Sequence, residues 1–104
     1  MVTCKKGVDY QALLPVCKVA ANQLKSIFLD FGYDMVLTST TEGEHSARSL
    51  HYHGLAFDVR SRTIRDDDLQ PLIKRIQQRL SVLDKRFQLV IEGNHFHIEF
   101  DRRK

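Results

Sequence analysis

The chain has 104 residues, which is enough for one domain around a single hydrophobic core and too few for a second core. Hydrophobic residues make up 42% of the chain and charged residues 28%, and no internal repeat or low-complexity segment is visible, so the composition argues against disorder. The net charge of +3 favours anionic surroundings such as nucleic acid, anionic lipid or acidic wall polymers, without choosing among them.

The basic residues form two small clusters, at Arg60, Arg62 and Arg65 and at residues 102–104. Three consecutive aspartates, residues 66–68, follow the first cluster directly. A solvated surface explains such mixed clusters better than a dedicated nucleic-acid site does. We therefore expect no nucleic-acid partner. We also expect the chain to be a monomer.

The chain has two cysteines, Cys4 and Cys17, and no C-x-x-C pair that would indicate a cysteine zinc site. Cys17 lies on an apolar stripe, so we expect a buried free thiol, with a bridge to Cys4 only after export. Residues 1–7 lack the apolar core of a signal peptide, and no run is long enough to span a membrane. These features predict synthesis in the cytoplasm without membrane insertion.

An amphipathic helix is predicted from about residue 11 to residue 31. Asp9 is a plausible N-cap, Pro15 fits the first turn, and Gly32 supplies a left-handed stop. The apolar residues recur at intervals of three and four, at Leu14, Cys17, Ala21, Leu24, Phe28 and Phe31. The β-rich residues 35–40 then predict a strand.

The next segment, residues 41–53, is polar and predicts a loop, and residues 55–59 predict a second strand. Strand alternation places Asp58 on the face opposite Phe57 and Val59. A carboxylate on a mostly apolar strand is costly to bury alone, so Asp58 needs a cation, which a metal or an arginine could supply.

A second amphipathic helix is marked by apolar residues between 69 and 80, begins at the aspartates and accommodates Pro71 in its first turn. Residues 87–92 and 95–100 read as two strands that are joined at Gly93-Asn94 by a tight hairpin turn. The fold class predicted from this order is α+β, a small antiparallel sheet covered by helices.

His95 and His97 lie two positions apart on the last strand, so both should point to the face opposite the apolar residues of that strand. If the strand of Asp58 neighbours the hairpin, Asp58 and His97 converge, and His51 in the preceding loop can reach them as a third ligand. Two histidines and an aspartate leave one position open on zinc, as in catalytic rather than structural sites.

A single histidine is more often solvated or simply hydrogen-bonded than metal-bound. Here, however, all the histidines fall in two short segments and none falls on a predicted helix. They are His45, His51, His53, His95 and His97. This concentration favours a shared metal site.

The spaced pattern Ser49-x-His51-x-x-Gly54-x-Ala56-x-Asp58, followed by His95-x-His97, resembles the zinc peptidase family of D-alanyl-D-alanine carboxypeptidases, phage L-alanyl-D-glutamate endolysins and related murein peptidases. With His45 included, the pattern is especially similar to the zinc site of the Hedgehog signalling domain. The match covers roughly residues 38–60 and 90–100. It implies a Hedgehog/D-Ala-D-Ala peptidase-like fold.

The resemblance implies that zinc is bound by His51, Asp58 and His97. It implies that Glu92 is the acid/base that takes the proton from zinc-bound water, and that His95 is a hydrogen-bonding group near the metal or the transition state.

The resemblance also implies roles in the first segment of the motif. His45 would stabilise the oxyanion, Ser49 would orient the loop, and Gly54 and Ala56 would leave room beside the metal. His53 has no counterpart in the motif and is interpreted as a solvent-facing or substrate-side residue.

Two points stay open. In the dipeptidase branch the catalytic glutamate lies three residues before its ligand histidine, which would make His95 the ligand in place of His97. Many carboxypeptidase members also carry an arginine soon after a Thr-Ser pair, whereas Thr38-Ser39 is followed here by two threonines and Glu42. The missing arginine favours cleavage inside a stem or cross-link peptide over recognition of a free C-terminal D-alanine.

The function predicted from these residues is a zinc metallopeptidase of phage or bacterial origin that cleaves peptidoglycan peptides at the cell wall. The alternative is a non-catalytic zinc-stabilised binding module of Hedgehog type. Glu92 favours the enzyme. It does so only moderately, because Hedgehog-like domains keep a comparable glutamate. A third hypothesis, a basic nucleic-acid binder, requires DNA affinity that falls steeply with salt.

Overall fold

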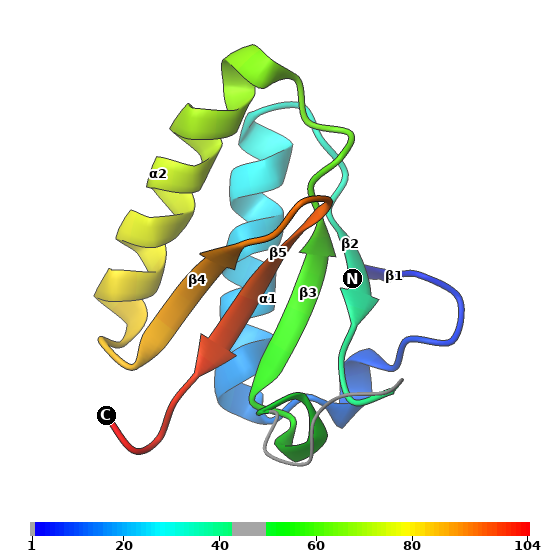
Figure 1. Ribbon diagram of the computed structural model, residues 1–104, viewed down its shortest axis with the longest axis vertical. Coiled ribbons are helices and arrows are strands. Elements are labelled where there is room, and N and C mark those ends of the chain that lie inside the picture. The colour runs from blue at the N-terminus through cyan, green and yellow to red at the C-terminus, as the bar shows by residue number, and fades with distance from the viewer. Residues whose placement is uncertain (1, 43–49) are drawn as a thin grey trace.

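A computed structural model describes residues 2–42 and 50–104 of the chain, except for the side chains of residues 51 and 52. This part of the chain contains two α-helices, two short 3-10 helices and five strands; Figure 1 shows how the α-helices and strands are arranged. In chain order they are β1 Thr3–Cys4, η1 Tyr10–Ala12, α1 Pro15–Asp30, β2 Val36–Ser39, η2 Leu50–His53, β3 Ala56–Arg60, α2 Asp66–Leu83, β4 Phe87–Ile91 and β5 His95–Phe100. The predicted α+β class is confirmed.

The five strands form one sheet in the order β1-β2-β3-β5-β4. All neighbours are antiparallel except β1 and β2, which are parallel, so the sheet is mixed and the predicted fully antiparallel sheet is wrong at this edge. The backbone N–H of Lys5 donates to the carbonyl of Leu37 at 2.8 Å just beyond the paired residues. A strand of two residues is too short to leave a periodic signal in the sequence.

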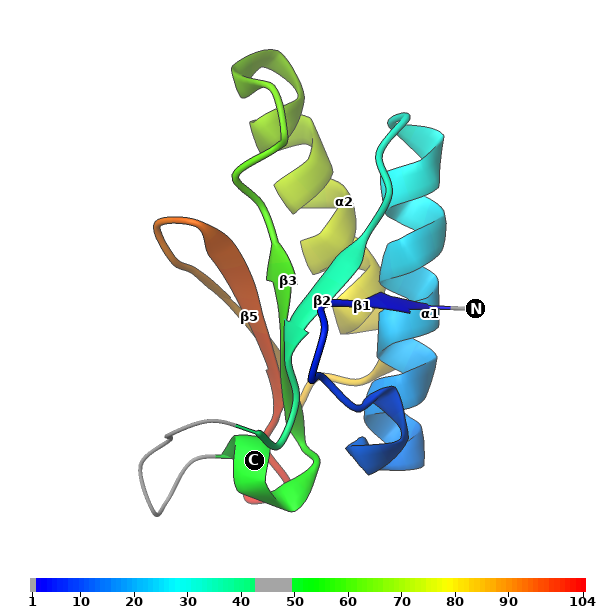
Figure 2. The same ribbon diagram turned by 90° about the vertical axis from the view of Figure 1, so that its right-hand side faces the viewer.

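Both α-helices cover the same face of the sheet, and the other face carries no α-helix (Figure 2). The core lies between the helices and the sheet, where the Phe28 and Phe96 rings meet edge to face with centroids 6.5 Å apart. Cys17 is buried there as a free thiol, as expected, and burial raises its pKa to about 12. Within the described ranges, no helix combines the length and apolar character needed to cross a membrane.

The first helix begins later than its apolar spacing predicts. Asp9 does cap a helix, but the helix is η1: its carboxylate accepts from the backbone N–H of Gln11 at 2.9 Å. Leu14 is extended, because a residue that precedes proline avoids the helical region, and Pro15 then occupies the first turn of α1. Gly32 has a φ of 85°, which confirms the predicted left-handed stop.

The second helix begins at the first of the three aspartates, as predicted from the preference of carboxylates for helix N-termini. Pro71 therefore lies inside α2 rather than in its first turn. Between the last two strands the chain reverses at Gly93-Asn94, and the backbone N–H of Glu92 donates to the carbonyl of His95 at 3.0 Å, so the predicted hairpin is confirmed.

Candidate metal centre

The candidate centre lies on the face of the sheet that the α-helices leave uncovered, where β3 runs beside β5. The antiparallel register pairs Asp58 with His97, Arg60 with His95 and Ala56 with Glu99. Along β5, burial alternates between half-buried His95, His97 and Glu99 and the fully covered residues between them. The prediction that His95 and His97 share a face is therefore confirmed, and the condition for Asp58 and His97 to converge, that the strand of Asp58 neighbours the hairpin, is met.

His97 is held between two carboxylates. Its Nδ1 lies 2.9 Å from Oδ1 of Asp58, and its Nε2 lies 2.9 Å from Oε1 of Glu99. The three side chains are shielded, with exposed fractions of 19% for His97, 14% for Asp58 and 23% for Glu99. The hydrogen bond to Asp58 raises the pKa of His97 above its ordinary value; burial opposes this rise, and Glu99 adds to it.

A neutral His97 can donate a hydrogen bond to only one of its two carboxylate neighbours. A neutral imidazole donates from one ring nitrogen only, and its other nitrogen is an acceptor. If Nε2 donates to Glu99, the Nδ1 lone pair faces the oxygen of Asp58, and two acceptors at 2.9 Å repel each other. A proton on Nδ1 or a metal ion between Nδ1 and Asp58 removes the conflict.

The two atoms lie at an ordinary hydrogen-bond distance and would have to move slightly apart to bind one zinc ion. Tetrahedral zinc with bonds of about 2.0–2.1 Å separates neighbouring ligand atoms by about 3.3 Å. The observed separation between Nδ1 of His97 and Oδ1 of Asp58 is 2.9 Å, so a shift of a few tenths of an ångström (~0.4 Å) would admit the ion. Glu99 on the opposite ring nitrogen matches the carboxylate that commonly orients a zinc-bound histidine.

His95 stands beside this pair. Its Nε2 lies 3.7 Å from Oδ2 of Asp58, and its Nδ1 lies 2.7 Å from Oδ1 of Asn94. One third of the His95 side chain is exposed, so it is more accessible than His97. His97 is closer to Asp58 and is held on both ring nitrogens, which makes it the better-oriented of the two candidate ligands.

A complete set of ligands does not emerge from the described side chains, among which no group of three or more histidine, cysteine, aspartate or glutamate residues is arranged to hold a metal ion. The predicted third ligand, His51, belongs to η2, and its side chain lies outside the described residues. His45 and Ser49, the residues expected to stabilise the oxyanion and to orient the loop, lie outside them as well.

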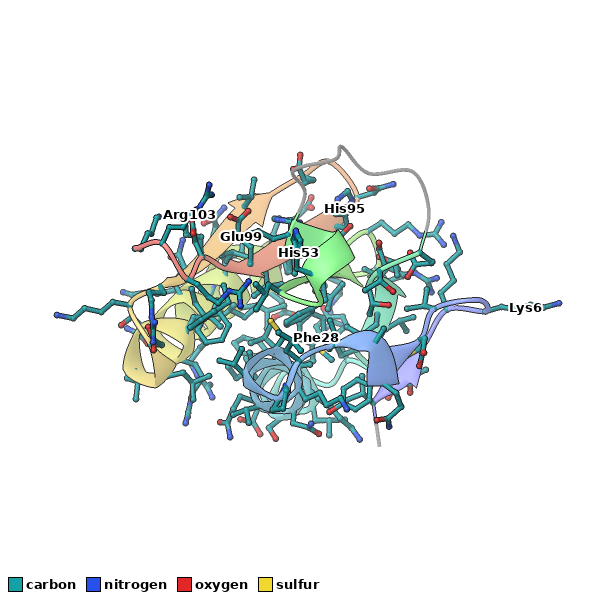
Figure 3. The ribbon with its side chains drawn as sticks, turned by 90° about the horizontal axis from the view of Figure 1, so that it is seen from below. Lys6, Phe28, His53, His95, Glu99 and Arg103 are labelled. Carbon is teal, nitrogen blue, oxygen red and sulfur yellow. The ribbon has the colours of Figure 1, made fainter. Side chains whose placement is uncertain are left out.

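Among the described residues, His53 and Glu92 form no hydrogen bond or ion pair with Asp58 or His97. His53 is exposed at the end of η2, where it borders a hollow of about 190 Å³ beside Arg103. Figure 3 shows His53, His95 and Glu99 on the side of the sheet away from α1 and Phe28. Glu92 is exposed in the hairpin turn and borders another hollow of about 300 Å³, with core residues such as Phe96.

Two residues within positions 38–60, the first region that the resemblance covers, have structural roles of their own. Gly54 has a φ of 70°, and a Cβ there would lie 2.6 Å from the carbonyl oxygen of Ala12, so backbone packing explains this glycine without reference to a metal. Glu42 folds back on the end of β2, where the backbone N–H of Thr40 donates to its carboxylate at 2.6 Å. Burial raises the pKa of Glu42, but its hydrogen bonds outweigh burial and lower it.

Glu99 is the residue of this centre that the sequence analysis missed. The signal was present, because residues 95, 97 and 99 alternate on one strand, and continuing the pattern two positions past His97 reaches a carboxylate on the same face.

Neither a scan against models of known protein families nor a search of curated protein sequences found a match for this chain.

Proposed function

We propose that this chain is a zinc-dependent peptidase that hydrolyses peptide bonds in the stem or cross-link peptides of bacterial peptidoglycan, on a fold of Hedgehog/D-Ala-D-Ala peptidase type. The observation that carries the proposal is the position of His97 between Asp58 and Glu99. Such a histidine, with one nitrogen oriented by a carboxylate and the other facing an acid, suits a metal ligand.

Asp58 and His97 would hold the zinc together with His51. When bound, zinc polarises a carbonyl oxygen and lowers the pKa of bound water towards about 7, which is the chemistry that peptide hydrolysis needs. An open fourth position would distinguish this centre from a structural zinc site.

The side chains around the ligands would orient the substrate and transfer protons. Glu99, 2.9 Å from Nε2 of His97, would accept a hydrogen bond from that nitrogen and so favour the tautomer that presents its Nδ1 lone pair to a metal. His95, one third exposed and 3.7 Å from Asp58, would donate a hydrogen bond to the carbonyl under attack. Glu92 would transfer the proton to the leaving amine, which requires its exposed side chain to turn towards the substrate.

A second candidate function is a zinc-stabilised binding module without catalysis. The observation that favours it is the position of Glu92 beside a separate hollow with Phe96, rather than beside Asp58. A site that binds the metal but lacks a carboxylate within reach of the substrate would be stable and inert.

Metal content tests the part that both candidates share. We expect about one zinc ion per chain, and we expect His51→Ala, Asp58→Ala and His97→Ala each to lose it while His53→Ala, a control in the same 3-10 helix as His51, retains it. Metal analysis after gel filtration and unfolding with and without chelator measure this. A purified protein without metal, whose stability is unchanged by chelator, would exclude both functions.

Digestion of purified peptidoglycan tests catalysis. Wild type should release peptides whose masses identify the scissile bond, and Glu92→Gln should keep metal and fold but lose at least about 100-fold in rate. The control is Asp67→Asn, which removes an exposed carboxylate at the start of α2. If metal-loaded wild type is inert on walls of several chemotypes, the binding-module function is the correct one.

A further inference from the structure

A hollow distinct from those beside His53 and Glu92 adjoins the candidate centre at the end of β3. It holds about 340 Å³ and is bordered by Asp58 and His95 of the centre, by Thr38 of β2, and by three cationic side chains, Lys5, Arg60 and Arg62. The cations come from three places in the chain: the residue after β1, the last residue of β3, and the turn that leads to α2. The fold therefore brings Lys5, which is far away in the sequence, next to the neighbouring cations Arg60 and Arg62.

None of these three cations is neutralised by an ion pair within the part of the chain that the structure describes. Other arginines do have acidic partners: Arg65 pairs with Asp68, and Arg86 pairs with Asp84. Asp58 is the carboxylate that borders the hollow, and its oxygens face His97 and His95. The hollow thus has an excess of positive charge beside the centre.

We propose that this hollow binds a free carboxylate of the substrate peptide, close to the bond that is cleaved; the proposal rests on the proposed peptidase function. Guanidinium groups match carboxylates because their donors form paired hydrogen bonds, and a partly enclosed site strengthens such bonds. Acidic residues and the free C-terminus of a stem peptide supply suitable groups.

The proposal also changes the interpretation of the missing arginine after Thr38-Ser39. Thr38 and Ser39 both border the hollow, so the end of β2 is a wall of this subsite even without an arginine of its own. Glu42 is not among the lining residues; its carboxylate accepts hydrogen bonds from Thr40 and from Ser39. The positive charges beside this wall belong to Arg60 of β3 and to Lys5, the residue after β1.

The test is a thermodynamic cycle with paired peptides. Stem peptides that are N-methylated at their backbone amides, to resist hydrolysis, are prepared with each carboxylate either free or converted to the carboxamide. Calorimetry then measures their binding to the metal-loaded wild type, to Arg60→Gln/Arg62→Gln and to Lys5→Gln. Arg79→Gln, an exposed arginine on α2, is the matched control. Arg62→Gln alone serves if the double variant does not fold, because Arg62 is exposed.

We expect amidation at one position to weaken binding to wild type about tenfold, as the loss of a charge-assisted hydrogen bond does. The double variant should weaken the acid peptide by a similar factor and leave the amide peptide unchanged, whereas Arg79→Gln should leave the acid–amide ratio as in wild type. An acid–amide ratio that the variants do not alter would overturn the proposal, as would binding of inorganic phosphate or DNA without any preference for acid over amide.

The two proposals fail separately. If wild type does not cleave peptidoglycan but the cycle shows coupling, the carboxylate subsite stands and the peptidase function falls. If wild type cleaves peptidoglycan and the cycle shows no coupling, the peptidase function stands and the subsite falls.

Discussion

The two faces of strands β3 and β5 differ in almost every physical property, although they share one backbone. On the helix side, Phe57, Val59 and Phe96 are at most 1% exposed and pack into the core. On the open side, Asp58 and His97 are shielded but polar, and they form hydrogen bonds rather than apolar contacts. Because strand residues alternate, each functional residue sits between two residues that the fold requires.

The apolar face fixes how the strands pair, whereas the polar face carries the residues of the candidate centre. The pairing of Asp58 with His97 is set by the register between β3 and β5, and that register is fixed by the apolar face, since a shift of one residue would turn every core side chain outwards. The centre is therefore positioned by residues that do not belong to it.

The largest expected effect comes from the apolar face. Phe96→Ala should lower the free energy of unfolding by about 3–5 kcal/mol, because it removes a fully buried ring that meets Phe28. Its neighbour His95 is one third exposed, so His95→Ala should change stability by about 0.5 kcal/mol or less. Urea denaturation in chelator measures both variants, and equal losses would contradict the division between the two faces.

A smaller effect is expected on the polar face. Glu99→Gln should weaken zinc binding roughly tenfold, because it replaces the charged acceptor that orients His97 with a neutral amide. Gln88 lies opposite Glu99 on β4, and Gln88→Ala is the matched control that should leave affinity unchanged. Competition against a chromophoric chelator gives the affinities. If Glu99→Gln binds zinc as tightly as wild type and Gln88→Ala do, Glu99 has no part in orienting a metal ligand.

Much of the fold was predictable because it depends on patterns that repeat. The four long strands, the two helices and the shared face of His95 and His97 all follow from apolar spacing and alternation. The edge strand β1 was not predictable, since two residues leave no pattern, and neither was the late start of α1, where the preference of Leu14 for extended backbone outweighed the helical spacing.

The candidate centre was predictable only in part, because it depends on distance across the sheet. The sequence indicated Asp58 and His97 as partners, and strand alternation also places Glu99 on their face, but nothing in the sequence indicated that Arg60 and Lys5 border one hollow. Cations far apart in the chain meet only through strand order, which here places β2 between β1 and β3. Local patterns do not contain that order.

The smallest expected effect is a difference between metal-free and zinc-loaded protein in how the free energy of unfolding depends on pH. The pKa of His97 is raised above its ordinary 6.5 by Asp58, so in metal-free protein its imidazolium stabilises the fold below pH 6.5, and this contribution is lost as pH rises through the folded-state pKa. Zinc requires neutral His97, so in zinc-loaded protein the stability should instead rise with pH over the same range. Urea denaturation at pH 6, 7 and 8, with chelator or with zinc, measures both slopes. The difference between wild type and His97→Gln isolates this residue from other titrating groups. Slopes of the same sign in both forms would mean that no metal replaces the proton between His97 and Asp58.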